Sequence, residues 1–228
     1  MLTPRLHGKG RIPVGLQLYS IREDCQKDLP SCLAAVTKLG YDGIEFAGYY
    51  DRSATDLRKI LVDLNLKAFS THINMKTLLG GELEKTVEFN QILGNSRLTV
   101  LSLPAASSIQ DWYGSARQFN GISEKLKQYD MRVGFHNLTH SPSTASIPSI
   151  TSSATRGRVR MMHCKDHPPC DRYVLLGDGT IEWKPLFQAA ESVGGIECYI
   201  IEQERYSAPL TPMQCAERCL RNFEKLHG

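Results

Sequence analysis

The chain lacks several features that would assign it to a class at once. It has no Cys-x-x-Cys pair, no block of five or more like charges and no apolar run long enough to cross a membrane. Its net charge of +3 over 228 residues is too small to indicate nucleic-acid binding. The opening stretch MLTPRLHGKGRIP has no apolar core of the kind a signal peptide needs. We therefore expect a cytoplasmic protein that binds neither nucleic acid nor membranes.

Seven cysteines are present, and several lie inside apolar periodic stretches. An odd number without paired spacing favours reduced thiols over a disulfide framework. Cys215 and Cys219 lie four residues apart on a predicted helix. A metal-binding pair is one interpretation of this spacing, but buried thiols are the favoured one.

A short apolar strand, a polar turn and an amphipathic helix recur along the chain. Strands are predicted at residues 14–19, 43–46, 66–72, 98–103, 131–136, 159–163 and 198–202. Helices are predicted to begin near Asp28, at Ser53 with Asp56 completing a capping box, and at Thr211–Pro212. Further helices are predicted over 82–93, from Trp112 to Leu126, and from Glu182. Strands that alternate with helices indicate a parallel sheet with the helices outside it.

Polar side chains stand where most of these strands end. The predicted strand ends are Tyr19, Glu45, His72, Ser102, His136, His163 and Glu202. In α/β barrels the carboxyl ends of the strands line the active site. The fold class predicted is therefore an α/β, TIM-type (β/α) barrel that forms one domain over residues 1–228, with these residues at its mouth.

Six stretches in this order resemble the xylose isomerase-like TIM barrel superfamily, which includes sugar phosphate isomerases, epimerases and inosose isomerases or dehydratases. They are GLQLYSIRED at 15–24, LGYDGIEFAG at 39–48, GFHN at 134–137, MMHCKD at 161–166, LLGDGTIEW at 175–183 and YIIEQER at 199–205. The resemblance implies a divalent metal ion at the barrel mouth, held from the ends of the last four strands. On this chain the implied ligands are His136, His163 and Glu202.

The resemblance also implies the remaining roles at the mouth. Mn²⁺ or Mg²⁺ is the expected ion, and imidazole ligands would also admit Zn²⁺ or Fe²⁺. Glu202 and His136 are the implied catalytic residues, although a histidine that binds the metal cannot also be a free base. The implied substrate contacts are Glu45, His72 and Lys165.

The ligand expected from the sixth strand has no counterpart in the sequence. Positions 136 and 163 are 27 residues apart, which fits one strand–helix unit of about 31 residues but not two. Residues 137–158 are rich in Ser, Thr and Pro and are predicted to form an irregular loop. The barrel is therefore predicted to be incomplete, with seven units. Three structural explanations stay possible: an unpaired seam in the sheet, a surrogate strand at 145–150, or a second copy of the chain that covers the gap. So does a splice form or an error in the gene model.

The function predicted is a metal-dependent isomerase or epimerase of a small sugar, keto-sugar or cyclitol, acting through an enediolate. A lyase that dehydrates a keto-cyclitol through the same chemistry is the first alternative. A catalytically degraded member of the family is the second, and a DNA-repair endonuclease on the same fold is the weakest.

Overall fold

The computed structural model describes residues 11–103, 107–136, 157–166, 173–206 and 209–228. Within them lie the strands β1 (Val14–Gln17), β2 (Gly43–Phe46), β3 (Lys67–Ile73), β4 (Arg97–Val100), β5 (Arg132–Phe135), β6 (Met161–Cys164) and β7 (Cys198–Ile201). The helices are α1 (Arg22–Leu39), α2 (Ala54–Asp63), α3 (Glu82–Leu93), α4 (Ile109–Lys127), α6 (Trp183–Ala189) and α7 (Pro212–His227). The prediction of seven strands is confirmed for the described residues.

The predicted helix starts are largely confirmed, because the capping side chains make the expected bonds. Ser53 Oγ accepts a hydrogen bond from the Asp56 backbone N–H at 3.1 Å, which is one of the two bonds of the predicted capping box. Thr211 and Gln214 form a reciprocal capping box at the start of α7, with Pro212 as its first residue. Each cap satisfies backbone donors that have no partner within the helix itself.

Helix α1 corrects the prediction of a start near Asp28. It begins at Arg22 and is interrupted at Asp28, whose φ of −152° is not helical. The Asp28 carboxylate accepts from the backbone N–H of Ser31 at 3.2 Å, as a capping residue does. The predicted start is therefore the cap of the second part of α1, and Pro30 lies in the first turn after it.

Two strands end two or three residues earlier than predicted. Strand β1 ends at Gln17 and is followed by a 3₁₀ turn over Leu18–Ile21, so Tyr19 lies in that turn. Strand β4 ends at Val100, and Ser102 lies beyond it as an exposed residue. The loop predicted over 137–158 falls mostly outside the described residues, as does the possible strand at 145–150.

The chain divides into two compact units, and the boundary falls inside β2. The first unit comprises Met1–Ile44 and Thr139–Gly228, and the second comprises Glu45–Leu138. Every strand pair whose register is defined runs parallel. The single domain predicted from the sequence stays a prediction.

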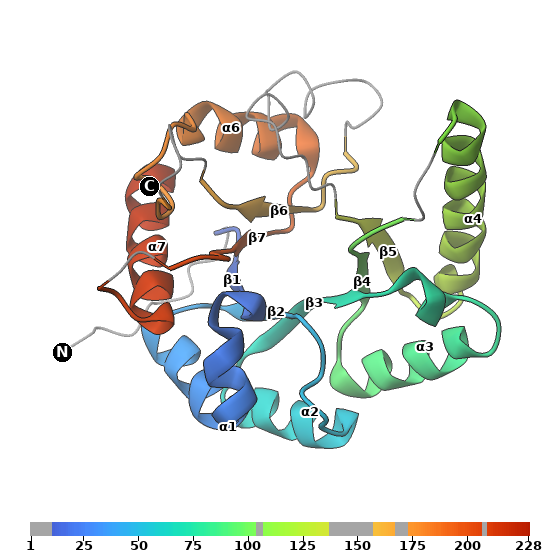
Figure 1. Cartoon of the computed structure of the whole chain (residues 1–228), viewed down its shortest axis with the longest axis horizontal. Coiled ribbons are helices and arrows are strands. Elements are labelled where there is room, and N and C mark those ends of the chain that lie inside the picture. Colours follow the sequence, from blue (N-terminus) through green and yellow to red (C-terminus); the bar gives the residue numbers. More distant parts are fainter. Residues whose placement is uncertain (1–10, 104–106, 137–156, 167–172, 207–208) are drawn as a thin grey trace. The chain divides into compact units, whose positions relative to one another are not determined.

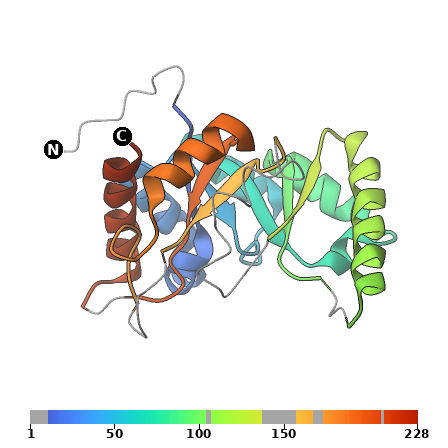
Figure 2. The same ribbon diagram turned by 90° about the horizontal axis from the view of Figure 1, so that it is seen from above.

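In the first unit the strand order is β2-β1-β7-β6. Helices α6 and α7 lie beside each other on the outer side of β7 (Figures 1 and 2). Aromatic rings fill the space between these helices and the strand, with Phe187 at the centre. Its ring centre lies 5.2 Å from that of Tyr199 and 5.3 Å from that of Phe223. This aromatic cluster fixes the position of β7 and therefore of the residues that follow it.

In the second unit the strand order is β2-β3-β4-β5, and helices α3 and α4 lie outside these strands (Figure 1). The core between them is mainly aliphatic and includes Leu83, Val87, Leu98, Val100 and Leu126. A network of amide and hydroxyl groups that includes Asn90 and Asn95 joins α3 to the strands. The amide and hydroxyl groups of this network thus satisfy one another within the unit.

Candidate active site at the strand ends

In the second unit, two histidines and a glutamate meet near the carboxyl ends of three strands. Glu45 on β2 is fully buried, and its Oε2 lies 3.0 Å from Nε2 of His72 on β3. His136 follows β5, and its backbone N–H donates to the Val100 carbonyl of β4 at 2.9 Å. The ring centres of His72 and His136 are 5.1 Å apart. The strand pairing thus brings together three residues that lie far apart in the sequence.

In the first unit, β6 and β7 place a second glutamate–histidine pair. His163 lies opposite Ile200 in the parallel register, and the backbone N–H of Glu202 donates to the Cys164 carbonyl at 3.2 Å. Nδ1 of His163 is therefore 3.0 Å from Oε2 of Glu202. Both side chains are largely buried. A buried carboxylate needs such a partner, because its desolvation is otherwise costly.

The neighbouring Lys165 and Asp166 have different partners. Lys165 Nζ lies 2.7 Å from an oxygen of Glu204, and both side chains are partly exposed. The Asp166 carboxylate accepts from the indole N–H of Trp183 at 2.9 Å and from the backbone N–H of Gly177 at 2.8 Å. Asp166 thus fixes the turn before α6, and Lys165 remains accessible at the end of β6.

Sequence reasoning missed the residues that hold the loops around His163 and Glu202. Arg22 Nη1 donates to the Glu204 carbonyl at 3.3 Å and to the Tyr206 hydroxyl at 3.1 Å, and its guanidinium lies over the Tyr19 ring. The buried Ser20 hydroxyl accepts from the backbone N–H of Gln203 at 2.9 Å. Ser20 and Arg22 belong to the stretch GLQLYSIRED, but no local pattern in it indicates which loop they contact.

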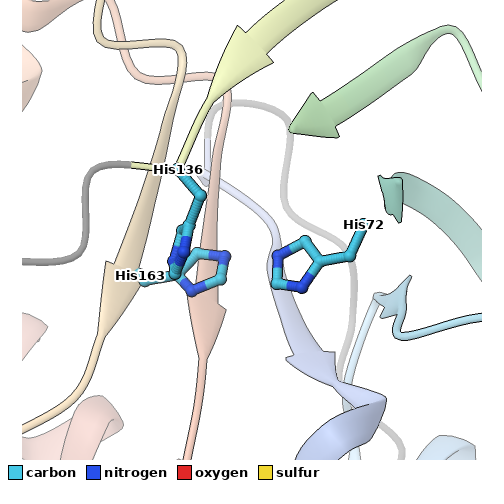
Figure 3. A group of neighbouring side chains, drawn as sticks. All are labelled: His72, His136 and His163. Atoms are coloured by element: carbon cyan, nitrogen blue, oxygen red, sulfur yellow. The ribbon is translucent and has the colours of Figure 1, made fainter. Parts of the chain in front are cut away.

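In the second unit, His72 and His136 could supply imidazole ligands to a metal ion (Figure 3). Two donors bound to one ion at right angles, each about 2.1 Å from it, are about 3.0 Å apart. The His163–Glu202 distance of 3.0 Å therefore fits two neighbouring ligands of one divalent ion. Burial raises the pKa of the Cys164 thiol, next to His163, well above its usual value.

The remaining predictions from the sequence have mixed outcomes. The six described cysteines are buried and form no disulfides, as predicted, and they include Cys215 and Cys219. Within the described residues, no helix has both the length and the apolar composition that a membrane crossing requires. The catalytic, substrate and ligand roles of the individual side chains stay predictions.

Comparison with known proteins identifies the fold. No family model matches the chain, and no curated protein matches it by sequence. Among solved structures, a sugar phosphate isomerase/epimerase from Parabacteroides distasonis superposes with a TM-score of 0.72 at 20% identity, over 98% of this chain and 97% of the other. The IOLI protein, solved with a bound zinc atom, gives a TM-score of 0.71 at 14% identity, over 94% of this chain and 97% of its own. A D-psicose 3-epimerase gives 0.65 at 16% identity, over 95% and 100%.

The chain therefore has the fold of the xylose isomerase-like TIM barrel superfamily, in an incomplete form with seven parallel strands in the described residues. The fold class predicted from the sequence is confirmed. At these identities the likeness establishes the fold, and the reaction has to be argued from the side chains.

Proposed function

We propose that the chain is a divalent-metal-dependent isomerase or epimerase of a small sugar, keto-sugar or cyclitol. The observation that supports this most is the contact between Glu202 and His163 at the ends of neighbouring strands. In a barrel the carboxyl ends of all strands face one mouth. His136 at the end of β5 would then complete the ligand set with these two residues.

The metal ion would supply positive charge that stabilises the oxygens of a substrate as its carbon-bound proton leaves. Imidazole-rich sets suit Zn²⁺, Fe²⁺ and Mn²⁺ better than Mg²⁺, which prefers oxygen ligands. A zinc atom is bound in the IOLI protein, which shares the fold. We therefore place Mn²⁺ and Zn²⁺ ahead of Mg²⁺ as candidates for this chain.

Glu202 is the proposed acid–base residue, because it is a buried carboxylate beside a histidine at the mouth. Lys165 is proposed to bind substrate hydroxyl or carbonyl oxygens, since its amino group is partly exposed at the end of β6. Glu45 and His72 are proposed to face the substrate from the second unit. Such groups orient a small carbohydrate while the proton moves.

The test is proton exchange between substrate and solvent. The metal-loaded chain is incubated in D₂O with a panel of ketoses and keto-cyclitols, and deuterium at the carbon next to the carbonyl is followed by NMR. Exchange that Glu202→Gln slows at least about 100-fold supports the proposal. The matched control is Glu191→Gln, which changes a glutamate that accepts from His227 on α7. An unsaturated product would identify the lyase alternative, and no exchange with any metal would refute both.

A further inference from the structure

The segment between His136 and His163 cannot supply the ligand that the sixth strand provides in the complete family pattern. It contains no Asp, Glu or Cys, and His140 is its one residue of a strongly metal-binding type. The proposed function therefore has three ligands where the resemblance implies four. A fourth side chain has to come from elsewhere, or the ion is held more weakly.

His72 on β3 has the setting of a metal ligand. Its side chain is 6% exposed, and its Nε2 lies 3.0 Å from the fully buried Glu45 carboxylate. A carboxylate at this distance holds a neutral imidazole in the tautomer with the proton on Nε2. Nδ1 is then the ring nitrogen that can bind a cation. Metal-binding histidines commonly have this arrangement, in which the second ring nitrogen donates to a carboxylate.

The distance between His72 and His136 fits two imidazoles bound to one ion. An imidazole nitrogen lies about 2.1 Å from a bound Zn²⁺, and the ring centre lies about 1.1 Å further on. Two rings at tetrahedral or octahedral angles then have centres roughly 4.6–5.3 Å apart. The observed separation is 5.1 Å, with the ring planes tilted by 46° rather than stacked.

We propose that His72 and His136 of the second unit are ligands of one metal ion, and that Glu45 is the residue that positions His72. This inference rests on the proposed function and assigns His72 a different role from the substrate contact that the resemblance implies. Both ligands proposed here are imidazoles, which favour Zn²⁺ over Mg²⁺.

The experiment is calorimetric titration of Zn²⁺ and Mn²⁺ into the metal-free full chain. His72→Gln is the main variant, because its amide can still donate to Glu45 while its side chain binds metals poorly. We expect His72→Gln to weaken Zn²⁺ binding at least about 50-fold and Glu45→Gln to weaken it about 10-fold. The visible spectrum of the Co²⁺-loaded chain should also change with His72→Gln, since band positions and intensities depend on the number and type of ligands.

The matched control is His227→Gln. His227 also lies against a glutamate, with Nε2 2.6 Å from Glu191, but it belongs to the C-terminal helix. We expect unchanged Zn²⁺ affinity in this variant, and far-UV circular dichroism verifies that each variant is folded.

Three outcomes separate this inference from the proposed function. A selective loss of affinity in His72→Gln supports His72 as a ligand. Wild-type affinity and an unchanged Co²⁺ spectrum in a folded His72→Gln chain overturn the inference and leave the proposed function standing. If the unmodified chain binds no divalent metal ion, the proposed function fails, and this inference fails with it.

Discussion

The two units present the same chemical pair in two different settings. In the second unit Glu45 contacts Nε2 of His72, and in the first unit Glu202 contacts Nδ1 of His163, both at 3.0 Å. Glu45 is fully buried, whereas Glu202 is 5% exposed. Glu204, two residues after Glu202, pairs with Lys165. We infer a division of roles between the two glutamates: Glu45 orients a histidine, and Glu202 is the carboxylate that moves a proton.

The largest expected effect tests this division directly. Glu202→Gln should lower the rate of substrate proton exchange about 10³-fold, because it removes the proposed acid–base group. Glu45→Gln should lower it about 10-fold to 100-fold, because it only weakens the orientation of His72. Both rates are measured by deuterium incorporation at saturating metal concentration. Equal losses in the two variants would contradict the proposed division.

The sequence predicts the first unit's pair more readily than the second unit's. His163 and Glu202 end strands that are neighbours in the sheet, and their short motifs MMHCKD and IIEQER indicate their positions. Glu45 and His72 were also found as polar strand ends, but their contact depends on β2–β3 register. Periodicity gives the face on which a strand residue lies, whereas register depends on packing along the whole strand.

Loop contacts were the least predictable part of the site. The bond from Arg22 to the Glu204 carbonyl joins residues 182 positions apart, and no local pattern encodes such a partner. The boundaries of β1 and β4 were missed for a related reason. Apolar residues continue past the hydrogen-bonded part of each strand, as in Leu101 after β4, so composition alone extends the strand too far.

The cores of the two units provide the next comparison. Phe187→Ala in the aromatic cluster should lower the free energy of unfolding by about 3–5 kcal/mol, and Leu98→Ala in the aliphatic core by about 2–5 kcal/mol. Urea unfolding is followed by far-UV circular dichroism and by the fluorescence of Trp183. Trp183 is buried in the first unit, and the background variant Trp112→Phe removes the exposed tryptophan of the second.

These two probes also test the single domain predicted from the sequence. If the units unfold cooperatively, the fluorescence and dichroism curves coincide for both core variants. Curves that separate, with Leu98→Ala changing the dichroism but not the Trp183 signal, would show that the units unfold independently.

A pH-dependent effect is expected from a buried cysteine of the first unit. Burial raises the pKa of the Cys219 thiol to about 12 from a usual value near 9.0. The thiol therefore stays protonated in the folded chain between these values but ionises in the unfolded chain. Its contribution to stability is complete below pH 9 and is lost as the pH rises toward 12, by at most about 1.4 kcal/mol per pH unit.

Cys219→Ala isolates this contribution. The variant loses buried volume at every pH, but its free energy of unfolding should fall less steeply between pH 9 and 10 than that of the unmodified chain. Urea unfolding at a series of pH values measures both slopes. Parallel slopes would show that the Cys219 thiol ionises equally in both states.

The smallest effect compares the helix caps of the two units. Thr211→Ala in the first unit and Ser53→Ala in the second should each lower the free energy of unfolding by about 1 kcal/mol, because each leaves a backbone donor without its side-chain acceptor. Thr211 belongs to a reciprocal box in which Gln214 also accepts from the Thr211 backbone N–H at 2.8 Å. Gln214→Ala should therefore destabilise the chain by a similar amount, and the double variant should cost less than the two single changes together, since the bonds share one geometry. Additive costs in urea unfolding would mean that the two bonds of the box form independently.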